Sequence, residues 1–414
     1  FVIAVPRFKK LQTLVDKLNL VTRENLVGLK VIRAFHNEKI EQKKFQQANA
    51  ELNKMNLFVN RLMMLLDPIM TLVMNFSSVA IVWFGAHLIS SGNLQIGNMM
   101  AFLEYAMQVI ISFLLLSMVF IMVPRAAVSV KRVGEVLDTL PSIVDPQSPQ
   151  QLPHDATGKI EFKDVTFTYP DADLPVLSSI NFTAEPGQTT AFIGSTGSGK
   201  STLINLIPRF YDVSAGQILL DGVDIRQLKL EELYDQIGYV PQKGVLFSGT
   251  IASNIKYGNA KASQKLVEKS AKIAQAAEFI GELKNGYKND IAQGGSNVSG
   301  GQRQRLSIAR AIAVEPNVYI FDDSFSALDF KTDAKLRFAL AKETKHKTVL
   351  IVGQRINTIM NADKIIVLDE GKIVGQGTHQ ELMKNCEVYQ EIAASQLSED
   401  DLQKMSATTA KGAA

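Results

Sequence analysis

The sequence has a single cysteine and no strong excess of either charge. Cys386 is alone among 414 residues, which excludes an intrachain disulfide, and no base-and-nucleophile pattern surrounds it, so we expect no catalytic thiol. The 44 Lys and Arg against 41 Asp and Glu give a formal net charge of +3, and we therefore expect no nucleic acid as a partner. These absences leave the distribution of apolar residues as the first informative feature.

Charge is nearly missing from two long apolar stretches, residues 69–89 and 98–123. About 20 such residues span the core of a bilayer. The link between the stretches, residues 90–97, is uncharged, whereas residues 6–61 hold many Lys and Arg. By the positive-inside rule, residues 6–61 are cytoplasmic, the link is external and the chain returns to the cytoplasm at Arg125. We predict two membrane spans in a hairpin; the alternative is two buried helices of a large soluble domain.

Residues 6–61 have few glycines and carry apolar residues at helical spacing. This pattern predicts long cytoplasmic helices that extend the spans and break near Gly28. Within them, residues 26–35 are too apolar for a free surface. We expect this segment to dock onto another domain.

The pattern changes after residues 139–157, a linker that four prolines interrupt. Residues 159–169 alternate in the manner of a half-buried antiparallel strand. Three short apolar runs are typical of strands in a buried parallel sheet: 189–193, 318–321 and 348–352. Because helical segments separate them, we predict an α/β domain over residues 155–395, followed by a disordered polar tail at residues 396–414.

Residues 194–201 match the phosphate-binding pattern G-x-x-x-x-G-K-[ST] at every fixed position, between a predicted strand and a predicted helix. The glycines let successive backbone N–H groups point at phosphate oxygens, and the helix N-terminus adds positive potential. Lys200 is expected to reach the β- and γ-phosphates, and the Ser201 hydroxyl is expected to bind Mg²⁺. The predicted ATP contacts in this P-loop are Gly194, Ser195, Thr196, Gly197, Ser198, Gly199, Lys200, Ser201 and Thr202.

A second Mg²⁺ ligand is expected at the end of another buried strand. Asp322 follows the apolar run 318–321 directly. Buried aspartates are rare without a partner, and a metal ion is a natural one. The sequence thus predicts that Asp322 and Ser201 share a magnesium ion.

Further motifs follow in order over residues 155–390, and together they resemble those of the ABC transporters. Gln242 resembles the glutamine of the Q-loop, and Tyr169 lies where the family stacks an aromatic ring on adenine. The resemblance implies ATP and Mg²⁺ as cofactors, with Gln242 as a further metal ligand. Two motifs are similar to the signature, preceded by Val298 where the family most often has Leu, and to the D-loop: Ser299-Gly300-Gly301-Gln302 and Ser326-Ala327-Leu328-Asp329.

The spans ahead of this domain resemble those of the exporter type, an all-α transmembrane region followed by an α/β P-loop NTPase domain. That type has six spans in each subunit. On this resemblance residues 1–138 are a partial transmembrane domain, in which residues 1–5 end the fourth span, 6–61 form the second intracellular loop and the two apolar stretches are spans five and six. The resemblance implies a multi-pass protein of the cell membrane, with a cytoplasmic nucleotide domain and with lipid and small-molecule cargo as partners.

In the family two nucleotide domains meet head to tail, so that the signature of one contacts the ATP held by the P-loop of the other. The apolar segment 26–35 then corresponds to the coupling helix, which docks on the opposite subunit.

Two departures from the family pattern fall on the residues that activate water. The family usually has Glu directly after Asp322, where this chain has Asp323, and His in the switch loop, where this chain has Gln354. Asp is one methylene shorter, which retracts the carboxylate by about 1.5 Å. A general base must lie within about 2.6–3.2 Å of its proton or act through one water, and Gln cannot carry positive charge. We expect Asp323 and Gln354 to occupy the catalytic positions of a degenerate ATP site.

This combination resembles one subunit of the heterodimeric bacterial multidrug exporters. Our hypothesis is ATP-driven export of amphipathic compounds or drugs, with a second exporter subunit as partner and with a heterodimer favoured over a homodimer. Lipid or peptide export is an alternative that differs only in cargo. A non-transporting, ATP-dependent regulatory switch is the alternative from a different class.

Overall fold

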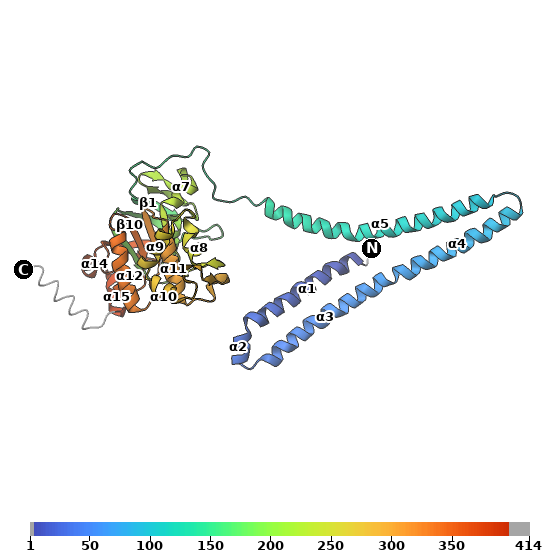
Figure 1. The fold of residues 1–414 in the computed structure, drawn as a ribbon, viewed down its shortest axis with the longest axis horizontal. Coiled ribbons are helices and arrows are strands. Elements are labelled where there is room, and N and C mark those ends of the chain that lie inside the picture. The colour runs from blue at the N-terminus through green and yellow to red at the C-terminus, as the bar shows by residue number, and fades with distance from the viewer. Residues whose placement is uncertain (1–3, 397–414) are drawn as a thin grey trace, which may run out of the picture. The chain divides into compact units, whose positions relative to one another are not determined.

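The computed structural model describes residues 4–396 (Figure 1). It divides into two compact units, Phe1–Leu140 and Pro141–Ala414. The first unit is helical, and the second contains all of the strands in the described part of the chain. This division agrees with the predicted fold class, an all-α region followed by an α/β domain.

Over its described residues, the helical unit consists of five helices: α1 Ala4–Val27, α2 Leu29–Ala34, α3 Glu38–Met64, α4 Leu66–Ser90 and α5 Ile96–Leu137. The break between α1 and α2 falls at Gly28, as predicted. Helices α1 and α3 run side by side (Figure 1), and a 2.8 Å ion pair between Lys17 and Glu51 joins them. Residues 4 and 5 belong to α1, whereas residues 1–3 of the predicted fourth span lie outside the described residues.

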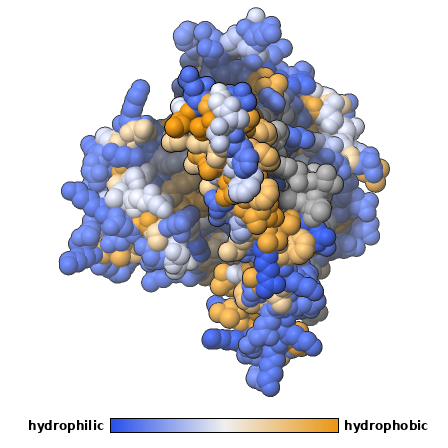
Figure 2. All heavy atoms as spheres, turned by 90° about the vertical axis from the view of Figure 1, so that its right-hand side faces the viewer, coloured by the Kyte–Doolittle hydropathy of each residue, from blue (hydrophilic) through white to orange (hydrophobic). Residues whose placement is uncertain are grey.

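The two predicted spans lie within α4 and α5. By length and composition, the helical stretches Glu38–Ser90 and Ile96–Phe113 are long and apolar enough to cross a membrane. Helix α5 has 42 residues, about 63 Å at 1.5 Å per residue, so it is longer than a bilayer core. Apolar side chains cover much of the hairpin surface, which Figure 2 views from the side of the α4–α5 turn. Phe76, for example, is 74% exposed, as expected for a helix whose solvent is lipid or other helices.

The second unit is built on a six-stranded sheet in the order β12-β11-β3-β10-β9-β6. All neighbours in it are parallel except the pair β11 and β12. The strands are β3 Thr189–Gly194, β6 Ile237–Val240, β9 Val318–Asp322, β10 Thr348–Val352, β11 Lys364–Asp369 and β12 Lys372–Gly377. Three of them lie where the apolar runs predicted strands, and β3, β9 and β10 are almost wholly buried, as parallel strands covered on both faces should be.

The same unit contains a second, antiparallel sheet of four strands in the order β2-β1-β4-β5. Its strands are β1 Ile160–Phe167, β2 Leu177–Ala184, β4 Ala215–Leu220 and β5 Val223–Asp224. The predicted half-buried strand at 159–169 is β1, which pairs antiparallel with β2 and β4. A short pair, β7 Gly249–Thr250 and β8 Asp290–Ile291, is also antiparallel.

The helices of this unit are α6 Lys200–Leu206, α7 Leu230–Asp235, α8 Ile251–Ile255, α9 Gln264–Ile273, α10 Ala277–Glu282, α11 Gly300–Ala313, α12 Phe330–Glu343, α13 Ile356–Ile359, α14 His379–Asn385 and α15 Glu387–Gln396, with short 3-10 turns between some of them. The predicted tail began at 396, but Gln396 is the last residue of α15. The rest of that tail, residues 397–414, lies outside the described residues.

The linker is tied to the second unit along its length. The Leu230 backbone N–H donates to Asp145 Oδ1 (2.7 Å), and the Leu152 N–H donates to Glu232 Oε1 (3.0 Å). Gln150 forms an isolated parallel bridge with Leu228. Pro141 and the residues after it therefore belong to the compact α/β unit, although prolines prevent a continuous strand there.

Candidate nucleotide site

The carboxyl ends of three neighbouring parallel strands place the predicted site at one edge of the sheet. Val352 at the end of β10 is in register with Asp322 at the end of β9 and with Phe192 in β3. Strand β3 then leads through residues 195–199 into α6. The side chains that follow these strands therefore meet at the same edge, where ligands of open α/β sheets bind.

The P-loop depends on glycine at both ends. At Gly194, φ is +157°, and a Cβ would lie 2.0 Å from the Leu368 carbonyl oxygen. At Gly199, φ is +95°, and a Cβ would lie 2.7 Å from a methyl carbon of Leu177. No side chain fits at either position, so the backbone can turn tightly from β3 into α6.

Lys200, the first residue of α6, folds its side chain back over the loop. Its Nζ donates to the carbonyl oxygens of Gly194 (2.9 Å) and Ser195 (2.6 Å) and to Ser198 Oγ (3.2 Å). Burial lowers the pKa of the Lys200 ammonium, against the attraction of the two nearby carboxylates, Asp322 and Asp323. A cation held in this position can exchange loop carbonyls for phosphate oxygens at little electrostatic cost.

Asp322 and Ser201 are brought together as the sequence predicts. Ser201 Oγ donates to Asp322 Oδ1 (3.2 Å), and Asp322 is only 6% exposed. Burial raises the pKa of the Asp322 carboxyl, mainly because the charge loses water. In the described part of the chain no group of three His, Cys, Asp or Glu could hold a metal by itself. A hydroxyl and a carboxylate are oxygen donors that fit Mg²⁺, which usually completes its shell with phosphate and water.

The Asp323 carboxylate is engaged by two amides. Its Oδ2 accepts hydrogen bonds from Gln354 Nε2 (2.8 Å) and from Gln242 Nε2 (3.3 Å). The backbone of Asp323 has φ +43°, and its N–H donates to the Val352 carbonyl (3.1 Å). Burial raises the pKa of the Asp323 carboxyl, and the hydrogen bond from Gln242 opposes this shift. Three of the predicted site residues thus form one hydrogen-bonded group beside the P-loop.

Tyr169 contacts α6, the helix that follows the P-loop. Its hydroxyl is 3.1 Å from Thr202 Oγ1, and its ring packs edge-on against Phe167 and Tyr211 at centroid distances of 4.8 and 5.2 Å. The side chain is half-buried. One ring face held in this way can stack on a planar base.

The signature residues form a second group, at the N-terminus of α11. Ser299 is the N-cap: its Oγ accepts from the Gln302 N–H (3.2 Å), and its own N–H donates to Gln302 Oε1 (2.9 Å). This reciprocal capping box leaves Ser299 and Gly300 exposed. A Cβ on Gly301 would lie 3.4 Å from the Ala327 carbonyl, so the signature abuts the D-loop of its own chain. Among the described residues, no hydrogen bond joins this group to the P-loop.

The D-loop connects the two groups. Ser326 Oγ donates to the Asp323 carbonyl (2.9 Å), and Leu328 packs against the buried core under α11. Asp329 caps α12 by accepting from the Thr332 N–H (3.0 Å), and this bonding lowers the pKa of the Asp329 carboxyl. The loop therefore starts at Asp323 and ends at a fixed helix cap.

Sequence reasoning missed two glutamines that hold site loops. Gln304, in α11 and 2% exposed, accepts from the Gly244 N–H (3.1 Å) and donates to the Pro241 carbonyl (3.3 Å), on either side of Gln242. Gln396 contacts the backbone on both sides of Arg355, next to Gln354. A polar residue at a buried helical position was the one available signal for Gln304; nothing in the sequence pointed to Gln396.

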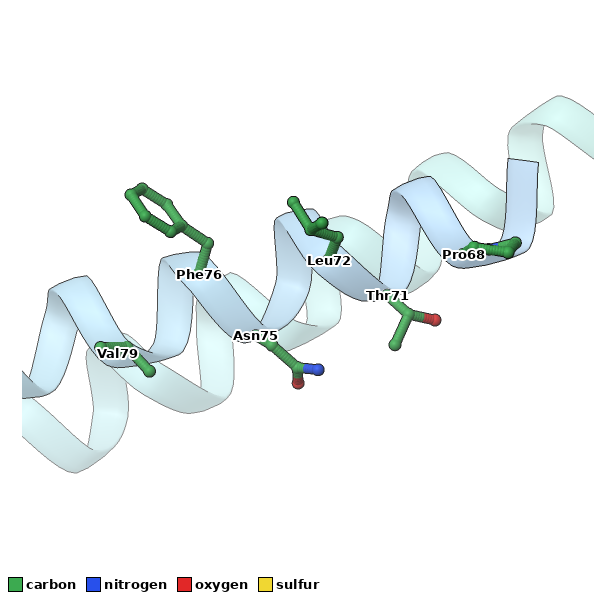
Figure 3. A pocket seen from close by; sticks show the side chains of 6 residues that line it. All are labelled: Pro68, Thr71, Leu72, Asn75, Phe76 and Val79. Carbon is green, nitrogen blue, oxygen red and sulfur yellow. The ribbon is translucent and has the colours of Figure 1, made fainter. Parts of the chain in front are cut away.

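A shallow groove in the helical unit is not part of this site. It follows one face of α4 and is lined by Pro68, Thr71, Leu72, Asn75, Phe76 and Val79 (Figure 3). Thr71 and Asn75 point to one side of the helix, whereas Leu72 and Phe76 point to the other. None of these side chains is titratable, so the groove offers no chemistry comparable to that of the P-loop.

Comparison with known proteins places this geometry in a family. The model of the ABC transporter domain matches residues 177–326, and that of the ABC transporter transmembrane region matches residues 4–128. An uncharacterized ABC transporter ATP-binding protein of Mycobacterium tuberculosis (strain ATCC 25618 / H37Rv) is 45% identical over 395 residues, which cover 95% of this chain and 68% of that protein. The chain belongs to the ABC transporter family.

Two further proteins define the type. An ATP-dependent lipid A-core flippase of Syntrophus aciditrophicus (strain SB) is 36% identical over 389 residues, 94% of this chain and 64% of the flippase. The structure of a bacterial Atm1-family ABC exporter with ATP bound superimposes with a TM-score of 0.82 at 29% identity, over 96% of this chain and 70% of that chain. The ABC exporter described here thus combines a transmembrane region with an ABC ATPase domain.

Several predictions about this ABC exporter are thereby confirmed at the level of the family. It is a membrane protein whose nucleotide-binding domain is cytoplasmic, and it is an ATP-binding and permease protein that couples ATP hydrolysis to transport. ABC ATPase domains bind nucleotide with Mg²⁺, and ABC exporters generally form dimers that contact lipid and cargo.

Proposed function

We propose that this exporter works as one half of a heterodimer, in which its own P-loop holds a slow ATP site and its signature completes a faster site on the partner. The observation that carries the proposal is the state of Asp323. A short carboxylate occupies the position of the general base, and two amides donate to the same oxygen of it. An oxygen that already accepts two hydrogen bonds is a poor proton acceptor for an attacking water.

The same contacts assign a role to each residue of the slow site. Lys200 and the P-loop N–H groups bind the phosphates, and the adenine stacks on Tyr169. Ser201, Asp322 and Gln242 hold Mg²⁺, which neutralises phosphate charge when it is bound. Gln354 donates a hydrogen bond to the γ-phosphate once its amide leaves Asp323. Because Gln354 can neither titrate nor carry charge, it binds the γ-phosphate without activating the attacking water.

The signature group supports the second half of the proposal. Ser299 and Gly301, with Gly300 and Gln302, lie at the N-terminus of a 14-residue helix, where the helix dipole favours an anion. Val298, the one departure from the family motif, packs half-buried against the core of the unit, so it changes volume but no polar contact. The group is therefore fit to bind the γ-phosphate of ATP held by the partner.

Coupling to the membrane region is proposed through α2. Apolar side chains in and around this helix are exposed, including Leu29 and Phe35, the latter at 72%. We assign them to contact with the nucleotide-binding domain of the opposite subunit. Gln293-Gly294-Gly295, a 3-10 turn before the signature, replaces an acidic sequence common in the family and would alter this contact.

The proposed cargo is an amphipathic compound or drug. Lipid export is the alternative that the flippase relative supports, and peptide export differs only in cargo. The competing class is a non-transporting regulatory ATP switch, against which the fused transmembrane region argues.

ATPase measurement on the full-length subunit, alone and with its partner, tests the proposal. The subunit alone should turn over slowly, and the assembled heterodimer should be faster. Brisk turnover by a homodimer of this chain would overturn the heterodimer and the slow site together. The neighbouring coding region offers an independent check, since an adjacent exporter subunit with Glu and His at the two catalytic positions is expected.

A further inference from the structure

The last residue of α15 carries a side chain that brackets the switch loop. Gln396 Nε2 donates to the Gln354 carbonyl oxygen (2.8 Å), and Gln396 Oε1 accepts from the Ile356 N–H (2.9 Å). These bonds join positions 42 and 40 residues apart in the sequence. One amide thus fixes the backbone on both sides of Arg355, immediately beside the Gln354 side chain.

The bond to Ile356 meets a need of α13. The first N–H groups of a helix have no partner within the helix, and Arg355, the N-cap of α13, makes no side-chain capping bond. Gln396 supplies that cap from another helix. At the other end of α13, Arg337 from α12 donates to the Thr358 carbonyl, so this four-residue helix is held from both sides.

Helix α15 is a firm support for this amide. Tyr389 and Ala393 are fully buried and pack in one apolar cluster with Ile356 and Ile359 of α13. The position of Gln396 therefore follows from the packing of α15 on the helix that it caps. The Gln396 side chain itself is exposed, and its two hydrogen bonds hold it against residues 354 and 356.

We propose that Gln396 is a positioning residue for the γ-phosphate: through the backbone of residues 354–356, it holds Gln354 where its amide can exchange Asp323 for the terminal phosphate of ATP. The inference rests on the role proposed above for Gln354. ADP lacks the γ-phosphate, so it gains nothing from this arrangement. Loss of the Gln396 amide should weaken ATP binding and leave ADP binding unchanged.

Photolabelling of the full-length exporter in lipid nanodiscs tests this, with 8-azido-ATP and 8-azido-ADP as probes and this chain resolved on a gel. Gln396→Met removes both hydrogen-bonding groups at similar size and should lower the ratio of ATP to ADP affinity about threefold to tenfold, the value of one or two hydrogen bonds. Gln396→Glu keeps the acceptor for Ile356 and should show a smaller loss. Unchanged ADP labelling reports that each variant is folded.

Gln390→Met is the matched control. Gln390 lies in the same helix and donates to the Met383 carbonyl (2.9 Å), away from the switch loop. The ratio of ATP to ADP affinity in Gln390→Met should therefore equal that of the unmodified protein. Equal losses for ATP and ADP, an unchanged ratio in Gln396→Met, or the same loss in the control would overturn the proposal. Photolabelling measures binding and involves no hydrolysis. A failure here therefore does not contradict the slow-site proposal, which is tested by ATPase turnover.

Discussion

In the proposed function, two helix N-termini of the nucleotide-binding unit bind the same ligand, a phosphate group, and they differ in how they are built. At α6 the loop buries Ser198 and Gly199 while its middle residues stay exposed, and Lys200 closes it with three hydrogen bonds. At α11 the cap is made by Ser299 and Gln302 themselves, and the first residues face solvent. The first terminus is closed by a cation of this chain, whereas the second abuts the D-loop through Gly301 and leaves Ser299 and Gly300 exposed.

The difference shows where the sequence departures matter. Asp323 and Gln354 are hydrogen-bonded to each other, and in the proposed function they affect only the site that this chain completes with its own P-loop. The α11 terminus keeps its capping box and its exposed glycine. In the proposed function, the chain therefore combines a weakened hydrolytic site with an unimpaired contribution to its partner.

Blocking the α11 terminus should have the largest effect on ATPase turnover. Gly300→Glu places a carboxylate in open space, since no atom lies within 4 Å of a Cβ there, and an acidic residue in the first turn suits the helix. It should repel the γ-phosphate across the interface and lower turnover of the assembled transporter by about 100-fold or more, the cost of losing transition-state contacts. ATPase assays of the heterodimer measure this. Gly281→Glu, also in open space, is the control and should keep its activity.

Restoring the two catalytic positions beside α6 should change turnover in the opposite direction, as an increase. Asp323→Glu with Gln354→His lengthens the base and supplies a titratable partner, and it should raise turnover by this chain's site about 10-fold or more, within the range of general acid–base catalysis. The assay uses the subunit alone and the heterodimer with an inactivated partner P-loop. No gain would show that the impairment lies elsewhere.

Base stacking should have an intermediate effect confined to the α6 site. Tyr169→Ala removes the stacking face and should weaken ATP binding to this chain by about fivefold to 100-fold, from 1–3 kcal/mol of base–aromatic stacking. Tyr169→Phe loses only the hydrogen bond with Thr202 and should be much milder. Photolabelling of each subunit measures this; a loss at the partner instead would contradict the assignment.

The smallest expected effect is on stability without nucleotide. Burial raises the pKa of Asp322, so the folded protein holds that proton more tightly than the unfolded chain. The resulting stabilisation is present below the ordinary carboxyl pKa of about 4 and is lost as pH rises through the raised value. Asp322→Asn should therefore raise the apo melting temperature at neutral pH by about 2 °C, a shift worth about 1 kcal/mol in a domain of this size.

Calorimetry with and without Mg-ATP checks that prediction. The unmodified protein should gain stability from Mg-ATP, and Asp322→Asn should lose most of this gain, because stabilisation by a ligand vanishes once its dissociation constant exceeds its concentration. A variant that melts lower than the unmodified protein in the absence of nucleotide would contradict the assigned burial cost.

The fold and the P-loop could be predicted because their signals are local. Strands β3, β9 and β10 are short apolar runs, and the spacing of Gly194, Gly199 and Lys200 fixes the loop. The assembly of Asp322 with Ser201 was predicted because a buried aspartate at the end of an apolar strand needs a partner, and a shared metal ion is a natural one. The fold class and the two apolar helices were confirmed on this basis.

The remaining features depend on contacts between distant residues. The hydrogen bonds of Gln354 and Gln242 to one oxygen of Asp323 need the exact turn at φ +43°, which no sequence period encodes. Gln304 and Gln396 hold loops 60 and 42 residues away. The tail boundary was set one residue early because polar composition does not reveal a side chain that caps another helix.

The fate of the γ-phosphate on this chain tests the central claim most directly. The assembled transporter hydrolyses 8-azido-ATP that carries label on either the α- or the γ-phosphate. The bound nucleotide is then photo-cross-linked, and the two subunits are separated. If this chain holds the slow site, its nucleotide keeps the γ-label relative to the α-label while nucleotide on the partner loses it. Equal loss of γ-label from both subunits would show that this chain hydrolyses ATP as fast as its partner.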